Sequence, residues 1–320
     1  MKNKDILRAH DNNYTTLPTQ SSEEPLVSVV LHCFNVSASL PKVLDGINKQ
    51  TYQNIEIIIV DDGSTENIRQ YIDRSSHRTR YIKHSFRQDR SAARNTGLAY
   101  AIGECTLILD PDIVLNIISI EKLVEAYKKY GNNIYVGFRE DISINELLSR
   151  LSNSIEADYK KDIRYRYNYT PRVPILSIFG QEKKTRVIRI LDETRLLKDF
   201  PAERVIGSWD LSAIITGHTM FMHTATAIAI GGFDEKYIGW GFDDIAFGAK
   251  MLTEGYKVIP VTESVGFHIA HPPHSISEEQ KWKEFFENRN RYFSWLNQEH
   301  QKMKFNFKRK IELIEDVIHK

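Results

Sequence analysis

The feature that most constrains the fold is a regular alternation of short β-branched runs with helical segments, which begins near residue 26. Five apolar runs predict strands: Val27 to Leu31, Ile55 to Val60, Tyr81 to Lys83, Thr106 to Leu109 and Ile134 to Val136. Helices are predicted between them, from about Ser39 to Gln50, after Ser64, from about Arg90 to Ile102 and from about Ile120 to Tyr130. This alternation is typical of a mostly parallel sheet with helices on both faces, so we expect an α/β fold.

The alternation breaks between residues 140 and 210 and then resumes. The later predicted elements are a strand from Thr219 to Met222, helices near Thr224 to Ile230 and from Asp243, and strands near Val258 and Val265. Aromatic residues at near-helical spacing after Ser277 predict C-terminal helices. We therefore expect a polar tail over 1–24, one domain over 25–275 with an insert at 140–210, and a helical extension over 276–320.

Composition narrows the classes of protein. With 41% hydrophobic and 27% charged residues, the chain is not disordered over its whole length. A net charge of +1 offers no global attraction for nucleic acid, and we expect no such partner. No apolar run reaches about 18 residues, which predicts no transmembrane segment and leaves peripheral membrane contact open. Cys33 and Cys105 flank core strands, so we expect buried free thiols and a cytoplasmic location.

One stretch of the expected insert is basic. Residues 158–204 hold 12 Lys or Arg against 7 Asp or Glu. A solvated helical face explains this excess, and a patch that binds an acceptor or a partner is the alternative.

Polar residues follow three of the predicted strands, where ligands bind in sheets of this type. They are Cys33-Phe34-Asn35, Asp61-Asp62-Gly63-Ser64 and Asp110-Pro111-Asp112. Phe34 can stack on a base and Asp62 can accept a base N–H, although Asp61 to Ser64 also has the composition of a turn and helix cap. The chain lacks a Gly-x-Gly-x-x-Gly fingerprint and a phosphate loop ending in Gly-Lys-Ser/Thr, so phosphates must be held in another way.

A divalent metal is the natural substitute. Asp110 and Asp112 offer oxygen ligands suited to Mg²⁺ or Mn²⁺, leaving coordination sites for diphosphate oxygens. His268 could add a nitrogen ligand, with His271 as the alternative, while a purely structural histidine is the simpler interpretation. Arg94, near the start of a predicted helix, fits either a phosphate contact or a surface salt bridge.

A second acidic pair lies far along the chain. Asp243 and Asp244 follow Gly239-Trp240-Gly241-Phe242 at the expected start of a helix. A carboxylate such as that of Asp244 can act as a general base toward a bound hydroxyl group. Two acids that cap a helix N-terminus are the structural alternative.

Taken in order, these segments and Ser91-Ala92-Ala93-Arg94-Asn95-Thr96-Gly97 resemble the family 2 glycosyltransferases. The family has the GT-A fold, a Rossmann-like nucleotide-diphospho-sugar transferase fold, and the resemblance covers roughly residues 25–275. The block from Gly231 to Asp244 also resembles the Trp-Gly-x-Glu-Asp motif of chondroitin-polymerase-type enzymes and animal β-1,4-galactosyltransferases.

The resemblance implies roles for individual residues. Those expected at the donor are Phe34 on the uracil, Asp62 on the base, Asp110 near the ribose, and Asn35 and Arg94. Those expected at the metal are Asp112 and His268. Asp244 matches the catalytic base, and because retaining relatives carry Asn there, it implies inversion. Those expected at the acceptor are Trp240, His218 and Asp243, although Asp243 stands where the family usually has Glu.

The expected function is metal-dependent, inverting transfer of a hexose or N-acetylhexosamine from a UDP-sugar to a hydroxyl, with Mn²⁺ or Mg²⁺ as cofactor. A saccharide is the favoured acceptor. The alternatives are the same donor chemistry on a peptide or small natural product, and a catalytically silent protein that binds sugar nucleotides.

Overall fold

The computed structural model describes residues 23–142, 215–254, 258–269, 277–297 and 314–319, together with 146, 147, 150, 162 and 256. The described strands are β1 (Val27–Cys33), β2 (Ile55–Asp61), β3 (Arg78–His84), β4 (Cys105–Leu109), β5 (Ile113–Leu115), β6 (Ile134–Ile142), β7 (Thr219–His223), β8 (Val258–Ile269) and β9 (Ile314–His319). The described helices are α2 (Leu40–Asn48), the 3₁₀ helix η1 (Ile68–Arg74), α3 (Asp89–Tyr100), α4 (Ser119–Tyr130), α8 (Thr224–Ala229), α9 (Asp243–Thr253) and α10 (Glu278–Asn297). The predicted alternation is confirmed. Most of the 1–24 tail and of the 140–210 insert lies outside the described residues.

The strands form one sheet in the order β5-β8-β6-β7-β4-β1-β2-β3-β9. β4, β1, β2 and β3 run parallel to one another, and so do β6 and β8. β7 is antiparallel to both its neighbours, and β5 and β9 are antiparallel at the two edges. The α/β class with a parallel central sheet is therefore as expected, and the two strands predicted near Val258 and Val265 are the single strand β8.

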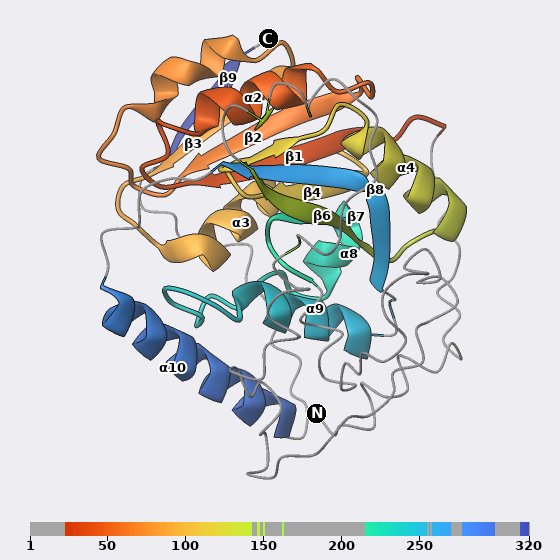
Figure 1. Cartoon of the computed structure of the whole chain (residues 1–320). Coiled ribbons are helices and arrows are strands. Elements are labelled where there is room, and N and C mark those ends of the chain that lie inside the picture. The colour runs from red at the N-terminus through yellow and green to blue at the C-terminus, as the bar shows by residue number, and fades with distance from the viewer. Residues whose placement is uncertain are drawn as a thin grey trace.

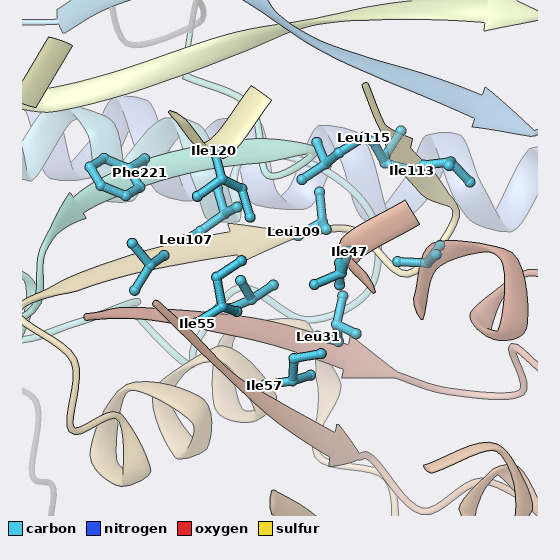
Figure 2. Packing of buried hydrophobic residues seen from close by; sticks show 14 of the residues in the cluster. Leu31, Ile47, Ile55, Ile57, Leu107, Leu109, Ile113, Leu115, Ile120 and Phe221 are labelled. Atoms are coloured by element: carbon cyan, nitrogen blue, oxygen red, sulfur yellow. The ribbon is translucent and has the colours of Figure 1, made fainter. Parts of the chain in front are cut away.

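Helices cover both faces of the sheet, with α2 and α4 on one side and α3, α8 and α9 on the other (Figure 1). Successive residues of a strand point to opposite faces, so a strand buried on both faces is apolar throughout. In β1, Val29 and Leu31 join the core beneath α2 and α4, whereas Val30 joins the core beneath α3. Figure 2 shows the first of these cores, in which Leu31 and Ile57 pack with Ile47 of α2.

Helix α10 packs on the outer side of α9 and the loop before it, away from the sheet (Figure 1). Its Tyr292 and Trp295 share an apolar cluster with Phe242 and Ala246. Of the C-terminal helices predicted after Ser277, the described residues contain α10. The expectation of a helical extension over 276–320 is wrong at Ile314–His319, which forms β9 and extends the sheet beside β3.

Two further expectations concern the cysteines and membrane-spanning helices. Both cysteines are free and buried, as expected. Among the residues that the structure describes, no helix is long and apolar enough to cross a membrane.

Helix α3 approaches β1 closely at Gly97. A Cβ atom at Gly97 would stand 2.2 Å from Val30 Cγ1, far inside contact distance. Close packing of this kind leaves no room for an added methyl group.

We expect Gly97→Ala to lower the free energy of unfolding by about 1–3 kcal/mol because it overpacks this contact. Denaturant unfolding measures the effect. Val30→Ala should cost less in the Gly97→Ala background than in the native chain, since it removes the clashing methyl groups. Additive losses from the two substitutions would contradict the contact.

Candidate active site

The first part of the site lies at the ends of β2 and β3. Asp62 is buried, and its Oδ1 accepts a hydrogen bond from the backbone N–H of Gln88 at 2.8 Å. The same oxygen lies 2.8 Å from Nδ1 of His84, whose Nε2 lies 2.9 Å from Oγ1 of Thr96. Asp62 is therefore held in one orientation at the carboxyl edge of the sheet, where the resemblance places the nucleotide base.

The neighbouring aspartate has a different task. Asp61 is fully buried, and its Oδ1 accepts the N–H of Ser64 at 2.8 Å. Its Oδ2 accepts the hydroxyl of Tyr81 at 2.5 Å. Gly63 has a φ of +74°, which a side chain disfavours. The turn interpretation of this segment thus applies to Asp61.

Phe34 and Asn35 follow β1 on the same edge. The Arg87 guanidinium lies 4.4 Å from the centre of the Phe34 ring, in cation–π geometry. Asn35 has a φ of +53°, and its Oδ1 accepts the backbone N–H of Thr65 at 3.0 Å. The Asn35 side chain therefore ties the loop after β1 to the loop after β2, and a donor contact from it stays a prediction.

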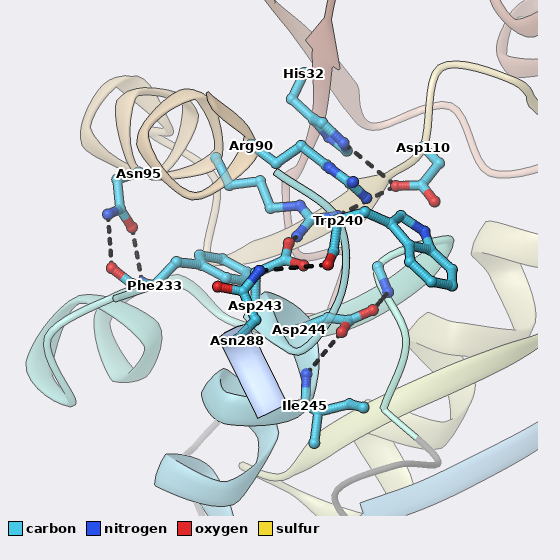
Figure 3. Close-up of polar contacts among 12 residues, drawn as sticks. His32, Arg90, Asn95, Asp110, Phe233, Trp240, Asp243, Asp244, Ile245 and Asn288 are labelled. Carbon is cyan, nitrogen blue, oxygen red and sulfur yellow. Dashed lines mark hydrogen bonds and ion pairs between the residues drawn. The ribbon is translucent and has the colours of Figure 1, made fainter. Parts of the chain in front are cut away.

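Arg94 connects the two acidic segments, whose residues Asp110 and Asp243 are shown in Figure 3. This α3 residue is 1% exposed, and its guanidinium pairs with Oδ2 of Asp243 and, at 3.3 Å, with Oδ1 of Asp110. Gly217 lies against the Arg94 guanidinium. A Cβ atom at Gly217 would stand only 2.1 Å from an Arg94 nitrogen. Of the two interpretations of Arg94, the structure shows a salt bridge, but a buried one that joins residues 149 positions apart. Its phosphate contact stays a prediction.

The charged groups in this cluster shift one another's pKa values. Burial favours the neutral acid, yet Arg94 lowers the pKa of Asp243. Burial raises the pKa of Asp110. The positive charge of Arg94 lowers this pKa, whereas the negative charge of Asp112 raises it. His32, at the end of β1, lies with Nε2 3.4 Å from Oδ1 of Asp110.

Asp244 stands beside this cluster and is a partly buried residue. Its Oδ2 accepts the N–H of Gly217 at 2.8 Å, and its Oδ1 accepts the N–H of Ile245 at 2.8 Å (Figure 3). Burial and then the negative charge of Asp243 raise the pKa of Asp244 to about 6. A carboxyl with this pKa is largely ionised at neutral pH but retains an unusual affinity for a proton.

His218 begins the segment that leads into β7. Its backbone carbonyl accepts a hydrogen bond from the N–H of Asp110, and Nδ1 of its ring forms a hydrogen bond with the hydroxyl of Thr216. It is 3% exposed. His218 thus lies next to the acidic cluster, while its contact with an acceptor stays a prediction.

The predicted metal ligands lie close together beside β5 and β8. Asp112 precedes β5 and His268 lies near the end of β8, and their Oδ2 and Nε2 atoms are 3.4 Å apart. Nδ1 of His268 lies 3.0 Å from Oδ1 of Asp141, which in turn accepts hydrogen bonds from Arg139. Burial opposes protonation, but the two carboxylates raise the pKa of His268 to about 9.

These residues fit a divalent cation. A carboxylate and an imidazole face each other, and a carboxylate behind the imidazole is the partner that metal-bound histidines commonly have. Within the described residues, no group of three or more His, Cys, Asp or Glu could hold a metal, so the remaining ligands would have to come from elsewhere, such as a diphosphate. His271, the alternative ligand, lies outside those residues.

Sequence reasoning missed two supporting residues. His84 directly follows the predicted run Tyr81 to Lys83, so examining the end of that strand could have identified it. Asp141 is opposite His268 in the pairing of β6 with β8. No sequence signal revealed it, because β6 was expected to end at Val136 and continues to Ile142.

The chain is similar to known families and proteins over most of its length. Residues 28–185 match the family model "Glycosyl transferase family 2", and residues 209–275 match "N-terminal domain of galactosyltransferase". Glycosyltransferase GlyG of Streptococcus pneumoniae is 35% identical over 115 residues, 35% of this chain and 38% of the relative. Validoxylamine A glucosyltransferase of Streptomyces hygroscopicus is 24% identical over 271 residues, 80% of this chain and 58% of the relative.

Solved structures show the same fold. TarS 1-349 of S. aureus, in complex with UDP-GlcNAc, has a TM-score of 0.53 at 13% identity, covering 86% of this chain and 68% of that one. GalNAc-T7 with UDP, GalNAc and Mn²⁺ has a TM-score of 0.54 at 16% identity, covering 91% and 56%. The chain belongs to glycosyltransferase family 2 and has the GT-A fold. It spans 38% to 58% of the length of the curated relatives named above.

We expect Arg94→Met to lower the free energy of unfolding by about 3–5 kcal/mol, because it leaves the buried Asp243 carboxylate without its counter-charge and removes one partner of Asp110. Denaturant unfolding at pH 7 measures this loss. Asp243→Asn in the same background should recover part of it by removing one of the two charges. A loss below about 1 kcal/mol would show that the pair is not desolvated.

Proposed function

We propose that this protein transfers a hexose or N-acetylhexosamine from a UDP-sugar to a hydroxyl acceptor, with a divalent metal and with inversion at the anomeric carbon. The observation that carries the proposal is the shared ion pairing of Arg94 with Asp110 and Asp243. This pairing brings the end of β4 to the start of α9. The end of β4 resembles the segment that binds the donor and the metal in the family, and the start of α9 resembles the segment that binds the acceptor and carries the base.

The donor end of the proposal rests on Phe34 and Asp62. A ring and a fixed carboxylate at neighbouring strand ends can stack on a uracil and accept its N–H. Asp110 would lie nearer the ribose. The TarS and GalNAc-T7 structures contain UDP-GlcNAc and UDP respectively, which supports a uridine nucleotide as the donor carrier.

Asp112 and His268 would hold Mn²⁺ or Mg²⁺, with Asp141 orienting the imidazole. Such an ion neutralises the charge that develops on a leaving diphosphate. The GalNAc-T7 structure contains Mn²⁺, which supports this choice of cofactor.

Asp244 is proposed as the general base. The acceptor oxygen forms a bond to the anomeric carbon while the bond from that carbon to the diphosphate oxygen breaks, and the hydroxyl proton passes to the Asp244 carboxylate. Two backbone N–H groups orient this carboxylate, and its pKa of about 6 suits proton transfer near neutral pH. Asp243 is engaged by Arg94, so its side chain would shape the acceptor side and Asp244 would take the proton.

A second candidate changes only the acceptor. The match to Validoxylamine A glucosyltransferase extends over 80% of this chain, across both family segments, and that relative's name specifies glucosyl transfer to a small molecule. A small natural product therefore stands beside a saccharide as an acceptor class. The cytoplasmic location remains part of the proposal, supported by the two buried free thiols.

Screening UDP-glucose, UDP-galactose, UDP-N-acetylglucosamine and UDP-N-acetylgalactosamine for UDP release, with glucose, N-acetylglucosamine and a mixed small-molecule pool as acceptors, tests the proposal. We expect release to require Mn²⁺ or Mg²⁺ and to stop on chelation. Asp141→Asn should raise the Mn²⁺ concentration for the half-maximal rate by about 10- to 100-fold, because His268 loses its orienting partner. NMR of the product should show the inverted anomer.

Full activity after chelation would remove Asp112 and His268 from a metal role. If UDP binds but no combination of UDP-sugar and acceptor turns over, the alternative of a catalytically silent protein that binds sugar nucleotides would be favoured.

Asp244→Asn should lower kcat by about 100-fold or more while the Kd for UDP is unchanged, because an amide cannot accept the proton. In the native enzyme, kcat/KM should fall about tenfold per pH unit below about pH 6, as the raised pKa of Asp244 leaves the base protonated there. Steady-state kinetics over pH 4.5–8 measures both effects. The control Asp45→Asn changes an exposed carboxylate of α2 and should leave both unchanged. Equal rates for Asp244→Asn and Asp45→Asn would refute the assignment.

A further inference from the structure

Helix α10 contacts the loop that leads into the acidic helix α9. The contact is partly apolar: Phe242 lies with its ring centre 5.1 Å from that of Phe285 and 5.4 Å from that of Tyr292. Phe242 has a φ of +66°, an unfavourable backbone conformation for a residue with a side chain. Burial of its ring against α10 offsets that cost, so the conformation of this loop depends on the helix.

Two polar side chains of α10 bind the backbone of the same loop. Glu284 accepts the N–H of Trp240 through Oε2 at 3.0 Å. Asn288 donates from Nδ2 to the carbonyls of Ile238 at 2.9 Å and Trp240 at 3.3 Å. The two residues are four positions apart and hence lie on one face of the helix. Together they bind three backbone groups within three residues of the loop.

The glycines of the loop permit this approach. A Cβ at Gly239 would stand 2.3 Å from Oε2 of Glu284, and one at Gly241 would stand 2.9 Å from the Phe285 ring. Both glycines have positive φ values, 75° and 93°. The spacing of glycines around Trp240 is thus matched to the presence of α10.

The loop is also attached from the opposite side. Arg90 of α3 donates to the carbonyl of Gly239 at 3.1 Å, which ties the loop to the helix that carries Arg94. The ring of Trp240 lies 4.7 Å from Nζ of Lys281 and 5.2 Å, between ring centres, from Phe285. Figure 3 shows Trp240, Asp243, Asp244 and Asn288 in one region.

We infer that Glu284 and Asn288 are positioning residues for acceptor transfer, acting through the backbone of residues 238–240 to set Trp240 and the start of α9. This inference rests on the proposed function of Asp243 and Asp244 on the acceptor side and on the predicted contact of Trp240 with the acceptor. Asn288 is 4% exposed, so its amide is withdrawn from water for these two bonds. The C-terminal helix is accordingly part of the acceptor side of the site, and the donor side at Phe34 and Asp62 does not depend on it.

The first test measures the loop itself. Glu284→Met removes the acceptor for the Trp240 N–H, whereas Glu284→Gln retains an oxygen at that position. We expect amide hydrogen exchange at Trp240 to be about tenfold faster or more in Glu284→Met, and near native in Glu284→Gln. Glu287→Met, an exposed glutamate on the same helix, is the matched control. Exchange in β1 should be the same in all variants.

The second test measures function with the pair of UDP-sugar and acceptor that turns over fastest in the screen above. Glu284→Met should lower kcat/KM for the acceptor by about tenfold without changing the Kd for UDP, and Glu284→Gln should restore it. Asn288→Asp, which sets a carboxylate against two carbonyls, should have the same effect without loss of UDP binding. A helix that only stabilised the fold would change UDP binding and acceptor kinetics together.

The outcomes separate the inference from the proposed function. If no pair turns over in the native protein, the proposed function fails, and exchange at Trp240 still decides whether Glu284 holds the loop. Unchanged exchange in Glu284→Met overturns the inference, and so does native acceptor kinetics in both Glu284→Met and Asn288→Asp. If Asn288→Asp does not fold, the comparison of Glu284→Met with Glu284→Gln and Glu287→Met is sufficient.

Discussion

The arrangement of the site depends on one buried cation. Arg94 lies between Asp110, at the end of a central strand, and Asp243, at the start of α9. Removing one member of a buried ion pair leaves an uncompensated charge, so these segments cannot separate without a large cost in free energy. Gly217 has no side chain and thereby leaves room for the guanidinium. The sheet and α9 are held in a fixed relation at the point where donor and acceptor are proposed to meet.

The same cation gives two adjacent aspartates different properties. Asp243 is paired directly, which keeps its pKa low, whereas Asp244 is partly buried beside a negative charge and has a pKa of about 6. Two adjacent acids are thus separated by their environments into one with a lowered pKa and one with a raised pKa. Separation of this kind is how enzymes obtain different roles from identical side chains.

Local patterns predicted the order of the elements well and their mutual contacts poorly. The strand runs and the polar residues after β1, β2 and β4 follow from hydrophobic periodicity, which depends on neighbours in sequence. Asp141 was not foreseen, because it acts through a strand pairing with His268 rather than through a motif. Glu284 and Asn288 carry no signal either, since polar residues four apart on an amphipathic helix are usually exposed.

Sequence alone determined the α/β class, the edge of the sheet where the polar residues gather and the residue types available there, because periodicity and strand ends are local properties. Tertiary structure decided how those residues are used: which aspartate shapes a turn, which pairs with Arg94, and which retains a raised pKa. It also decided that a helix at the far end of the chain holds the loop before α9. Burial and pairing set the charge of a group and the position of a backbone, and both arise only when distant segments pack together.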